Sequence, residues 1–302
     1  MRAIVTGGAG FIGSHLVDAL VARGDEVHVV DNLATGRREN VPPEVELHER
    51  DVRDPLDDLF HAVEPEVCFH LAAQADVRVS VDRPVFDAEV NVLGTLRVLE
   101  GAGRNGTRVV FSSTGGAIYG ECDHPAPESA ERKPFSPYGV AKLAGEEYLA
   151  ADRRLRRTPH VSLRYANVYG PRQDPHGEAG VVAIFFNRLV AGEPPLVYGD
   201  GSQTRDYVHV SDVVRATLAA ERAEGTVYNV GTGVETSVLA LLERCCIVAG
   251  VDAEPEYAPT RLGELERSVL DPSLAGRGLA WRPQHDLDSG LRSTWAWFSP
   301  RG

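Results

Sequence analysis

Thr6-Gly7-Gly8-Ala9-Gly10-Phe11-Ile12-Gly13 follows directly on a short apolar run, Ala3-Ile4-Val5, in this chain of 302 residues. The spacing of Gly8, Gly10 and Gly13 fits G-x-G-x-x-G. In this pattern the glycines permit a tight turn, a close approach of the backbone to a pyrophosphate, and close packing of the next helix on the strand. The segment therefore predicts a strand, a loop and the start of a helix.

The residues that follow complete the same pattern. Apolar side chains recur at helical spacing from Phe11 to Val21, and Gly24 predicts the end of the helix. A second apolar strand, Val27-His28-Val29-Val30, ends at Asp31. A helix N-terminus favours a phosphate, and a carboxylate at this strand end can accept both ribose hydroxyls of an adenosine. We therefore predict a dinucleotide site.

The carboxylate of Asp31 also selects between the two nicotinamide dinucleotides. It disfavours a 2′-phosphate, so the cofactor is predicted to be NAD and not NADP. Arg37 and Arg38 are the opposing observation, because arginines near this loop can hold the extra phosphate. They lie six and seven residues beyond Asp31, which we take as too far for them to reverse the preference of this carboxylate for NAD.

Strands and helices alternate through the first half of the chain. Further strands are expected over 45–48, 66–74 and 107–112, and a long amphipathic helix over 87–104. This alternation predicts an α/β protein with a doubly wound parallel sheet, the Rossmann arrangement. Its ligands are expected beyond the carboxyl ends of the strands.

Three strand ends therefore matter in addition to the glycine loop. Asp51, before Val52, could accept a hydrogen bond from an adenine amino group, or it could cap the next helix. The small residues of 71–74 would let the backbone lie close to the cofactor's second ribose. Ser112-Ser113-Thr114-Gly115-Gly116 is the third such end.

Composition limits the class of protein. Lys and Arg number 31 against 44 Asp and Glu, giving a net charge of −13 that is spread along the chain, so we expect no nucleic-acid partner. The 4 cysteines show no C-x-x-C, so we expect no disulfide framework and no metal. Neither a signal peptide nor a membrane segment is expected, which predicts a cytoplasmic protein without a membrane partner.

Candidate chemistry lies in Ser136-Pro137-Tyr138-Gly139-Val140-Ala141-Lys142. Ser136 and Pro137 predict a helix start, which places Tyr138 and Lys142 four residues apart on one helical face. A tyrosine with a pKa of about 10 is a poor base, but a nearby ammonium favours its phenolate. The pair therefore predicts a base that removes a proton from a sugar hydroxyl.

With these residues in place, the chain resembles the extended short-chain dehydrogenases/reductases, and within them the NAD-dependent nucleotide-sugar epimerases and dehydratases. The resemblance covers nearly the whole chain. It includes the glycine loop, the Tyr138 and Lys142 pair, and the segments 31–32, 51–52, 70–73, 91–95, 112–114, 163–172, 205–210 and 261–264.

The resemblance implies roles for individual residues. Thr114 is implied as the hydroxyl partner of Tyr138 and Lys142 in catalysis, with Ser113 as the alternative. Related dehydratases carry an Asp-Glu pair after this threonine, whereas this chain has Gly115-Gly116. The implied NAD contacts are Gly7, Gly10, Phe11, Ile12, Gly13, Asp31, Asn32, Leu33, Thr35, Gly36, Asp51, Val52, Leu71, Ala72, Ala73, Gln74, Asn91, Ser112, Tyr138, Lys142 and Tyr165.

A nucleotide sugar is the implied substrate. Arginines are the natural diphosphate ligands, and a small residue at 268 is implied to admit an acetamido group. The implied substrate contacts are Thr114, Tyr138, Asn167, Val181, Val182, Leu196, Tyr198, Arg205, Arg261, Glu264 and Ser268.

The resemblance also implies the organisation and activity of the protein. Residues 1–165 would form the dinucleotide-binding domain and 166–302 mainly a smaller α/β domain for the substrate, with strands near 205–231 returning to the first domain. The implied activity is C4 epimerisation of a UDP-hexose by a homodimer that recycles NAD. The alternatives are a UDP-uronic acid 4-epimerase, a decarboxylase, a dehydratase, or a catalytically idle NAD-binding regulator.

Overall fold

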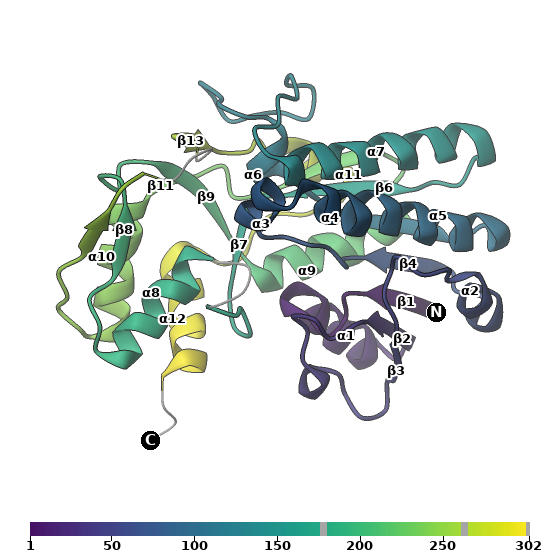
Figure 1. The fold of residues 1–302 in the computed structure, drawn as a ribbon, viewed down its shortest axis with the longest axis horizontal. Helices are drawn as coiled ribbons and strands as arrows, with labels where there is room; N and C mark the ends of the chain where they lie inside the picture. The colour runs from purple at the N-terminus through teal and green to yellow at the C-terminus, as the bar shows by residue number, and fades with distance from the viewer. Residues whose placement is uncertain (176–179, 261–264, 300–302) are drawn as a thin grey trace.

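The protein is described by a computed structural model of residues 1–175, 180–260 and 265–299. It consists of two lobes (Figure 1). The larger lobe is built on a seven-stranded parallel sheet in the order β10-β6-β5-β4-β1-β2-β3. Its strands are β1 (Arg2–Thr6), β2 (Glu26–Asp31), β3 (Glu46–Glu49), β4 (Val67–His70), β5 (Arg108–Thr114), β6 (Val161–Tyr165) and β10 (Val227–Val230).

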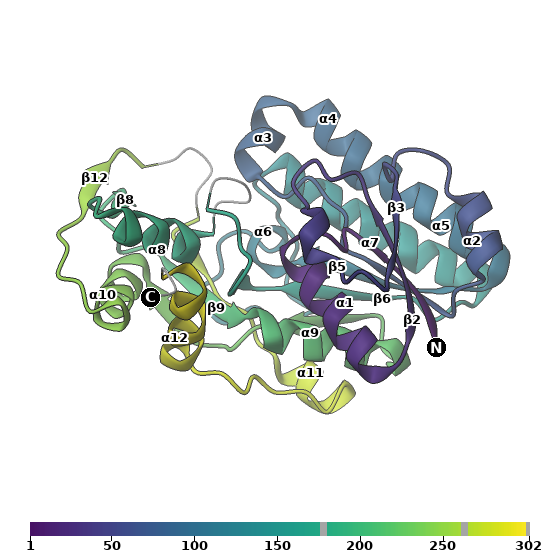
Figure 2. The ribbon, with the colours of Figure 1, turned by 90° about the horizontal axis from the view of Figure 1, so that it is seen from below.

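Helices cover both faces of this sheet (Figure 2). On one face lie α1 (Phe11–Arg23), α9 (Val210–Ala219) and α11 (Ser273–Gly278). On the other lie α2 (Asp57–Val63), α5 (Gly94–Asn105) and α7 (Pro137–Arg156). The predicted doubly wound parallel sheet is confirmed. Shorter helical segments connect these elements: η1 (Arg38–Asn40), α3 (Val77–Asp82), α4 (Pro84–Ala88), α6 (Gly115–Ile118) and η3 (Ala220–Arg222).

The central strand β1 shows why the sheet is covered on both sides. Its successive side chains point to opposite faces, and each face is apolar. Val5 packs in the cluster that contains Leu16 of α1, whereas Ile4 packs in the cluster that contains Phe60 of α2. A strand that is buried on both faces is typical of parallel sheets between two helix layers.

The smaller lobe holds most of the C-terminal half. Its core is an apolar cluster that includes Phe185, Phe186 and Leu241. The helices are α8 (Val181–Ala191), α10 (Val238–Ala249) and α12 (Leu287–Phe298). The strands are β7 (Asn167–Tyr169), β8 (Leu196–Tyr198), β9 (Thr204–His209), β11 (Glu235–Ser237), β12 (Glu256–Ala258) and β13 (Arg267–Ser268). Among the described residues no helix is long and apolar enough to cross a membrane.

Two strands, β9 and β10, lie in the region near 205–231 where strands are expected to return to the first domain. β10 pairs in parallel with β6 and forms an edge of the main sheet. β9 instead pairs with β7, β11 and β13 in a separate sheet. The apolar content of a segment predicts a buried strand but does not predict which strand it pairs with. In the main sheet β6 pairs with β5 on one side and with β10 on the other, so β9 cannot pair with β6. The division of domains at residue 165 stays a prediction.

The helix expected over 87–104 is interrupted. α4 ends at Ala88, a π-helical turn covers Glu89–Leu93, and α5 begins at Gly94. The backbone N–H of Gly94 donates to the carbonyl of Glu89, five residues earlier. One extra residue in a turn scarcely alters the apolar period, which is why the sequence pattern does not reveal it.

A buried ion pair joins α7 to the main sheet. Arg164 of β6 and Glu146 of α7 are both almost completely buried, and two guanidinium nitrogens donate to the two carboxylate oxygens at 2.9 and 2.6 Å. Arg164 also donates to the Tyr119 hydroxyl at 2.7 Å. Removing one member would leave the other charged in a low-dielectric interior.

We therefore predict that Glu146→Ala lowers the free energy of unfolding by about 3–5 kcal/mol. Glu147 is the matched control, because it neighbours Glu146 on α7 but forms an exposed pair with Arg132. Glu147→Ala should cost less than about 1 kcal/mol. Urea denaturation of the three proteins measures both changes, and equal losses would contradict the prediction.

Candidate active site

The glycine loop after β1 is held at very short range against the turn after β4. Gly7 has a φ of +73°, and a Cβ there would lie 2.6 Å from the Ala72 amide nitrogen. A Cβ at Gly13 would lie 2.1 Å from the Gly7 carbonyl oxygen. Only glycine permits this backbone approach. Within the described chain no side chain caps the N-terminus of α1, so its first N–H groups are left for an anion.

A cavity of about 400 Å³ lies at this loop. It follows the carboxyl ends of β1, β2 and β4, where the strand order reverses between β1 and β4. Doubly wound sheets bind their ligands at this position. The predicted cofactor residues that line it are Gly7, Gly10, Phe11, Ile12, Gly13, Asp31, Asn32, Thr35, Asp51, Val52, Leu71, Ala72, Ala73, Gln74 and Ser112.

Asp31 lies at the end of β2 and is mostly buried. One carboxylate oxygen accepts from the Ala9 amide at 3.0 Å and the other from the Leu33 amide at 2.8 Å. Burial raises the pKa of this carboxyl, and the two backbone bonds oppose that rise. Each oxygen keeps a second lone pair for a ribose hydroxyl.

The two nearby arginines lie outside this cavity. Arg37 forms an ion pair with Asp174 at 3.7 Å, and Arg38 forms one with Glu49 at 2.8 Å. Neither side chain lines the cavity. Their placement agrees with the choice of NAD over NADP.

Asp51 also lines the cavity but does not cap the next helix. α2 begins at Asp57, and its N-cap residue is Leu56. The Asp51 carboxylate instead accepts from the Arg53 side chain and from Asn32. The Arg53 guanidinium holds the pKa of this carboxyl well below its usual range.

Three predicted cofactor residues, Leu33, Gly36 and Asn91, line neither cavity of the site. A Cβ at Gly36 would lie 2.8 Å from an Asp31 oxygen, so this glycine makes room for the carboxylate. Asn91 lies behind the cavity wall, where its side chain bonds both the amide and the carbonyl of Gln74. Gly36 and Asn91 therefore shape the wall of the first cavity by positioning Asp31 and Gln74.

Asp87 is a residue that the sequence analysis missed. It is buried, and its Oδ1 accepts from the side chains of both Gln74 and Asn91, at 2.8 and 2.9 Å. Burial raises the pKa of this carboxyl. No sequence signal marked it, because its contact with Gln74, 13 residues earlier in the chain, forms only when the chain folds.

A second cavity, of about 490 Å³, adjoins the first and shares Phe11, Leu71 and Ser112 with it. It lies between the two lobes, and Thr114, Tyr138 and Lys142 all line it. The Ser136 hydroxyl accepts from the Gly139 amide and starts α7 as predicted. The structure therefore brings the three predicted catalytic residues together.

Lys142 is held firmly in this wall. It is buried, and its ammonium donates to the Ser112 carbonyl at 2.8 Å and lies 5.9 Å from the centre of the Tyr138 ring. His70 lies nearby, where burial lowers its pKa to about 3, with a further contribution from Lys142. The imidazole stays neutral and adds no competing positive charge beside the lysine.

The structure also distinguishes Ser113 from Thr114, the two candidates for the hydroxyl partner of Tyr138. Ser113 is buried, and its hydroxyl donates to Glu146 at 2.5 Å. Thr114 is more exposed at the end of β5. A Cβ built at Gly116 would lie 3.9 Å from the Thr114 Oγ1, 3.5 Å from the Asn167 Oδ1 and 4.0 Å from the Ser268 Oγ. These three polar side chains therefore surround one small space.

The substrate residues expected from the sequence fall into three groups. Arg261 and Glu264 lie outside the described residues, and Ser268 lies beside the second cavity without lining it. The predicted residues that line this cavity are Thr114, Tyr138, Asn167, Val181, Val182, Leu196, Tyr198 and Arg205. Val181 begins α8 after Gly180, so the N-terminus of this helix faces the cavity as expected.

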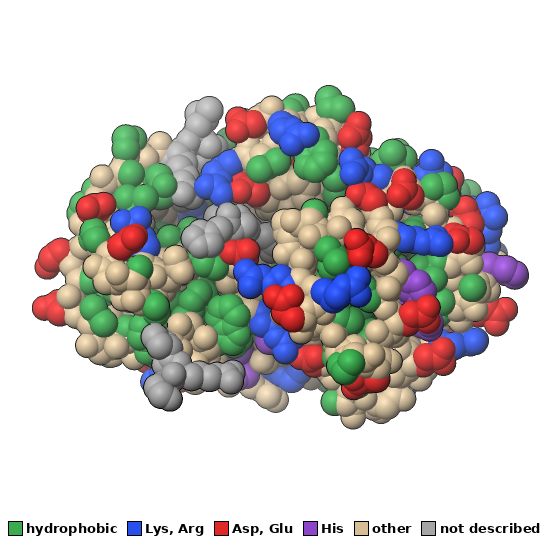
Figure 3. Space-filling view, turned by 60° about the horizontal axis from the view of Figure 1, so that its bottom comes forward, with side chains coloured by type: hydrophobic (Ala, Val, Ile, Leu, Met, Phe, Trp, Pro, Cys, Tyr) green, Lys and Arg blue, Asp and Glu red, His purple; other side chains and the backbone are tan. Residues whose placement is uncertain are grey.

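Two further cations in the cavity wall were missed by the sequence analysis, Arg78 and Arg188. Arg78 forms an ion pair with Asp76, and Arg188 donates to the Pro194 carbonyl at 2.5 Å. Figure 3 shows Lys and Arg side chains gathered along the junction of the two lobes. Arg78 lies on α3 and Arg188 on α8, far apart in the chain and in no motif, so only the tertiary structure shows that they share a cavity.

Comparison with known proteins agrees with this geometry. Residues 3–231 match the model of the NAD dependent epimerase/dehydratase family. The chain is 48% identical to the UDP-glucose 4-epimerase of Mycolicibacterium smegmatis, over 99% of this chain and 98% of that protein. The fold and the site define an NAD-dependent enzyme with a Rossmann domain. The chain belongs to the NAD dependent epimerase/dehydratase family.

Solved structures show the same likeness. The UDP-glucose 4-epimerase of Thermotoga maritima, solved with UDP-glucose, superposes with a TM-score of 0.97 at 46% identity, covering 99% of this chain and 98% of that one. The UDP-glucose 4-epimerase of Thermus thermophilus, solved with NAD, gives a TM-score of 0.95 at 48% identity, with 99% of each chain covered.

The first cavity fits NAD on its own features. The glycine loop leaves no room for a Cβ, the N-terminus of α1 has no side-chain cap in the described residues, and Asp31 offers lone pairs at the strand end. These features suit a pyrophosphate and an adenosine ribose.

We predict that Asp31→Ala weakens NAD binding about tenfold or more, because it removes charge-assisted hydrogen bonds to the ribose. Glu49→Ala is the control, since Glu49 is the register neighbour of Asp31 on β3 and lines neither cavity. Calorimetric titration with NAD and NADP measures the change. Tighter binding of NADP than of NAD by the unaltered protein would contradict the role of Asp31.

Proposed function

We propose that this enzyme catalyses the reversible C4 epimerisation of a UDP-hexose, UDP-glucose to UDP-galactose, through a 4-keto sugar. The observation that carries the proposal is the convergence of Thr114, Tyr138 and Lys142 on a cavity that adjoins the dinucleotide cavity. The relatives of known activity described above act on UDP-glucose, which supports the same substrate here.

The three residues have distinct roles in this reaction. Tyr138 takes the proton of the sugar 4-hydroxyl and later returns it, so it acts as base and then as acid. Lys142, fixed by the Ser112 carbonyl, supplies the positive charge that favours the phenolate. Thr114 donates a hydrogen bond to the 4-oxygen. When bound, NAD supplies a reversible hydride acceptor for C4.

Inversion requires that the sugar turns over while the nucleotide stays bound. The proposed UDP contacts are the N-terminus of α8, Tyr198 for the base, and Arg205 with Arg261 for the diphosphate. Arg78 and Arg188 add positive charge to the same cavity wall. Such charges hold the diphosphate firmly, whereas the space around Gly116 is bordered by the uncharged side chains of Thr114, Asn167 and Ser268. This distribution suits an epimerase.

The alternatives have less support from the described residues. A dehydratase needs an acid and a base after Thr114, where this chain has Gly115 and Gly116. Glu128 does not replace them, because its side chain accepts from the Asn229 amide at 2.7 Å. A catalytically idle regulator would not require Tyr138 and Lys142 in one wall. A uronic-acid epimerase or decarboxylase would act on a UDP-uronic acid in place of a UDP-hexose, and an assay with both substrates distinguishes these activities.

The direct test is incubation of the purified protein with UDP-glucose, UDP-galactose, their N-acetyl and uronic-acid forms, and dTDP-glucose. Products are resolved by chromatography. Interconversion of UDP-glucose and UDP-galactose without added NADH is the expected result. Turnover of uronic acids alone would replace the proposal with the uronic-acid alternative.

We predict that Tyr138→Phe folds, binds NAD and loses activity by about 10²–10⁴-fold or more, because only the proton acceptor is removed. Lys142→Ala should be impaired as well, and its remaining activity should move to higher pH because the phenolate loses its cationic neighbour. A pH–rate profile measures the shift. A near-normal rate in Tyr138→Phe, or an unmoved profile in Lys142→Ala, would refute these roles.

We also propose that the enzyme is a cytoplasmic homodimer. The described cysteines are free thiols, as in proteins of reducing compartments. An exposed apolar surface supports the dimer: Phe135, Val140 and Val92 line one shallow groove beside α7, and Phe135 is 63% exposed. The predicted dimer pairs the helices that contain 93–99 and 138–149.

Light scattering at micromolar concentration should show two chains per particle. Val140→Asp should yield monomers, because it puts a charge into the apolar contact. A monomeric unaltered protein would refute the dimer.

Ser268 is proposed to control access of N-acetylated sugars. Its hydroxyl oxygen lies 4.0 Å from a Cβ built at Gly116, and Thr114 and Asn167 border the same space. We predict that the unaltered protein interconverts UDP-GlcNAc and UDP-GalNAc, and that Ser268→Tyr loses this activity but keeps that on UDP-galactose, because the ring fills the volume of the acetamido group. Ser268→Ala is the control and should keep both. If the Tyr variant loses both alike, Ser268 is not the gate.

A further inference from the structure

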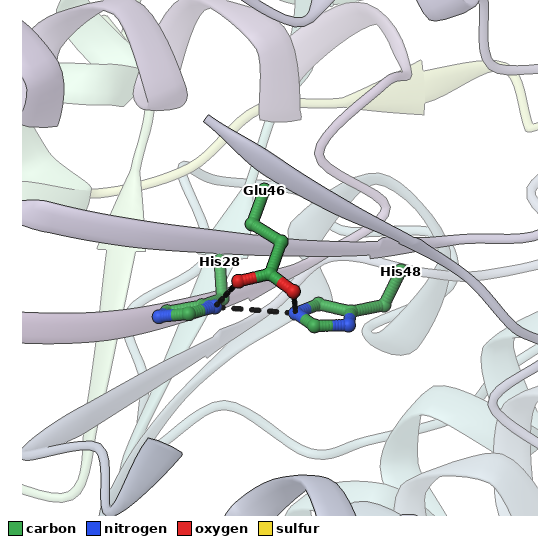
Figure 4. A group of neighbouring side chains, drawn as sticks. All are labelled: His28, Glu46 and His48. Carbon is green, nitrogen blue, oxygen red and sulfur yellow. Dashed lines mark hydrogen bonds and ion pairs between the residues drawn. The ribbon is translucent and has the colours of Figure 1, made fainter. Parts of the chain in front are cut away.

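Two histidines and a glutamate converge near the edge of the main sheet (Figure 4). His28 lies on β2, and Glu46 and His48 lie on the edge strand β3. Glu46 and His48 are two residues apart and share one face of the sheet. His28 is the register neighbour of Glu46, so its ring lies on that same face. None of the three residues lines either cavity of the active site.

The distances between their polar atoms lie within a few tenths of an ångström of the edges of a metal-coordination tetrahedron. His28 Nδ1 lies 3.1 Å from His48 Nε2 and 3.4 Å from a Glu46 oxygen, and the other Glu46 oxygen lies 3.8 Å from His48 Nε2. Zinc bonds of about 2.0–2.2 Å at tetrahedral angles separate the ligand atoms by about 3.3–3.6 Å. Figure 4 shows both rings turning a nitrogen toward the carboxylate.

A second carboxylate, that of Glu26, contacts His28 from outside the cluster of His28, Glu46 and His48. The other ring nitrogen of His28, Nε2, lies 3.4 Å from the Glu26 carboxylate. A histidine that binds a metal commonly donates its second ring N–H to a carboxylate, which fixes the tautomer and the ring orientation.

A proton and a cation would hold this cluster in different ways. One proton can join the two facing ring nitrogens in a single hydrogen bond. The Glu46 carboxylate then makes only long contacts, although both of its oxygens face the rings. A divalent cation at the centre would satisfy both nitrogens and the carboxylate together.

We propose that His28, Glu46 and His48 bind one divalent transition-metal cation of the zinc class, with water as the fourth ligand. Imidazole and carboxylate ligands suit this class. Glu46 is largely exposed, so the cation has a path from solvent. The cation links β3, which pairs with β2 alone among the described strands, to the strand that ends at Asp31. Its role is structural and independent of the proposed epimerase activity.

The test uses the full-length chain without an affinity tag, first freed of metals with a chelator. Calorimetric titration with zinc chloride should show one saturable site per chain. Zinc at about 100 times its dissociation constant should raise the melting temperature by roughly 4 °C. Magnesium at the same concentration should not, because it prefers all-oxygen sites. Cobalt should give the visible absorption of a tetrahedral site without thiolate bands.

Variants separate this site from the other histidines and the cysteines. His48→Gln should abolish saturable zinc binding, and Glu46→Gln should weaken it about ten- to hundredfold. His124→Gln is the control and should bind as the unaltered protein does, because His124 is an exposed histidine outside the cluster. Since Glu46 is exposed, Glu46→Gln should fold normally even if His48→Gln does not. The absence of saturable zinc binding by the unaltered protein, or unchanged binding by Glu46→Gln, would overturn the proposal.

Discussion

The active-site side of this protein depends on one close approach of backbone to backbone. Gly7 and Gly13 lie where any Cβ would overlap the Ala72 amide or the Gly7 carbonyl. This approach sets α1 directly behind the loop and brings the ends of β1 and β4 together. The uncapped start of α1, the Asp31 carboxylate and the turn at 71–74 therefore face a single cavity. A larger side chain at either glycine would separate them.

Behind the cavity wall that carries Tyr138 and Lys142, a buried polar network holds the end of β5 in place. Glu146 accepts from both Ser113 and Arg164, and Arg164 reaches the Tyr119 hydroxyl. Every member lies in the interior, where an unpaired charge is costly, so the arrangement has few alternatives. It occupies the Ser113 hydroxyl and thereby leaves Thr114 as the hydroxyl that faces the cavity beside Tyr138.

Much of the larger lobe follows from local patterns in the sequence. The glycine loop, the apolar strands and the helix that starts at Ser136 all lie within about 5 residues of where the patterns put them. The proposed catalytic pair, Tyr138 and Lys142, was recognisable because both residues lie on one helix, where a spacing of four fixes a shared face. Local backbone geometry alone determines such features.

Tertiary structure decided what depends on contacts between distant segments. It placed β9 in a second sheet and β10 at the edge of the first, and it brought the Asp51 carboxylate to Asn32 and the Asp87 carboxylate to Gln74. It also brought His28 next to His48, residues that carry no motif in the chain. Such pairings depend on strand register and on the burial of charged groups, and both are set only when the whole core is packed.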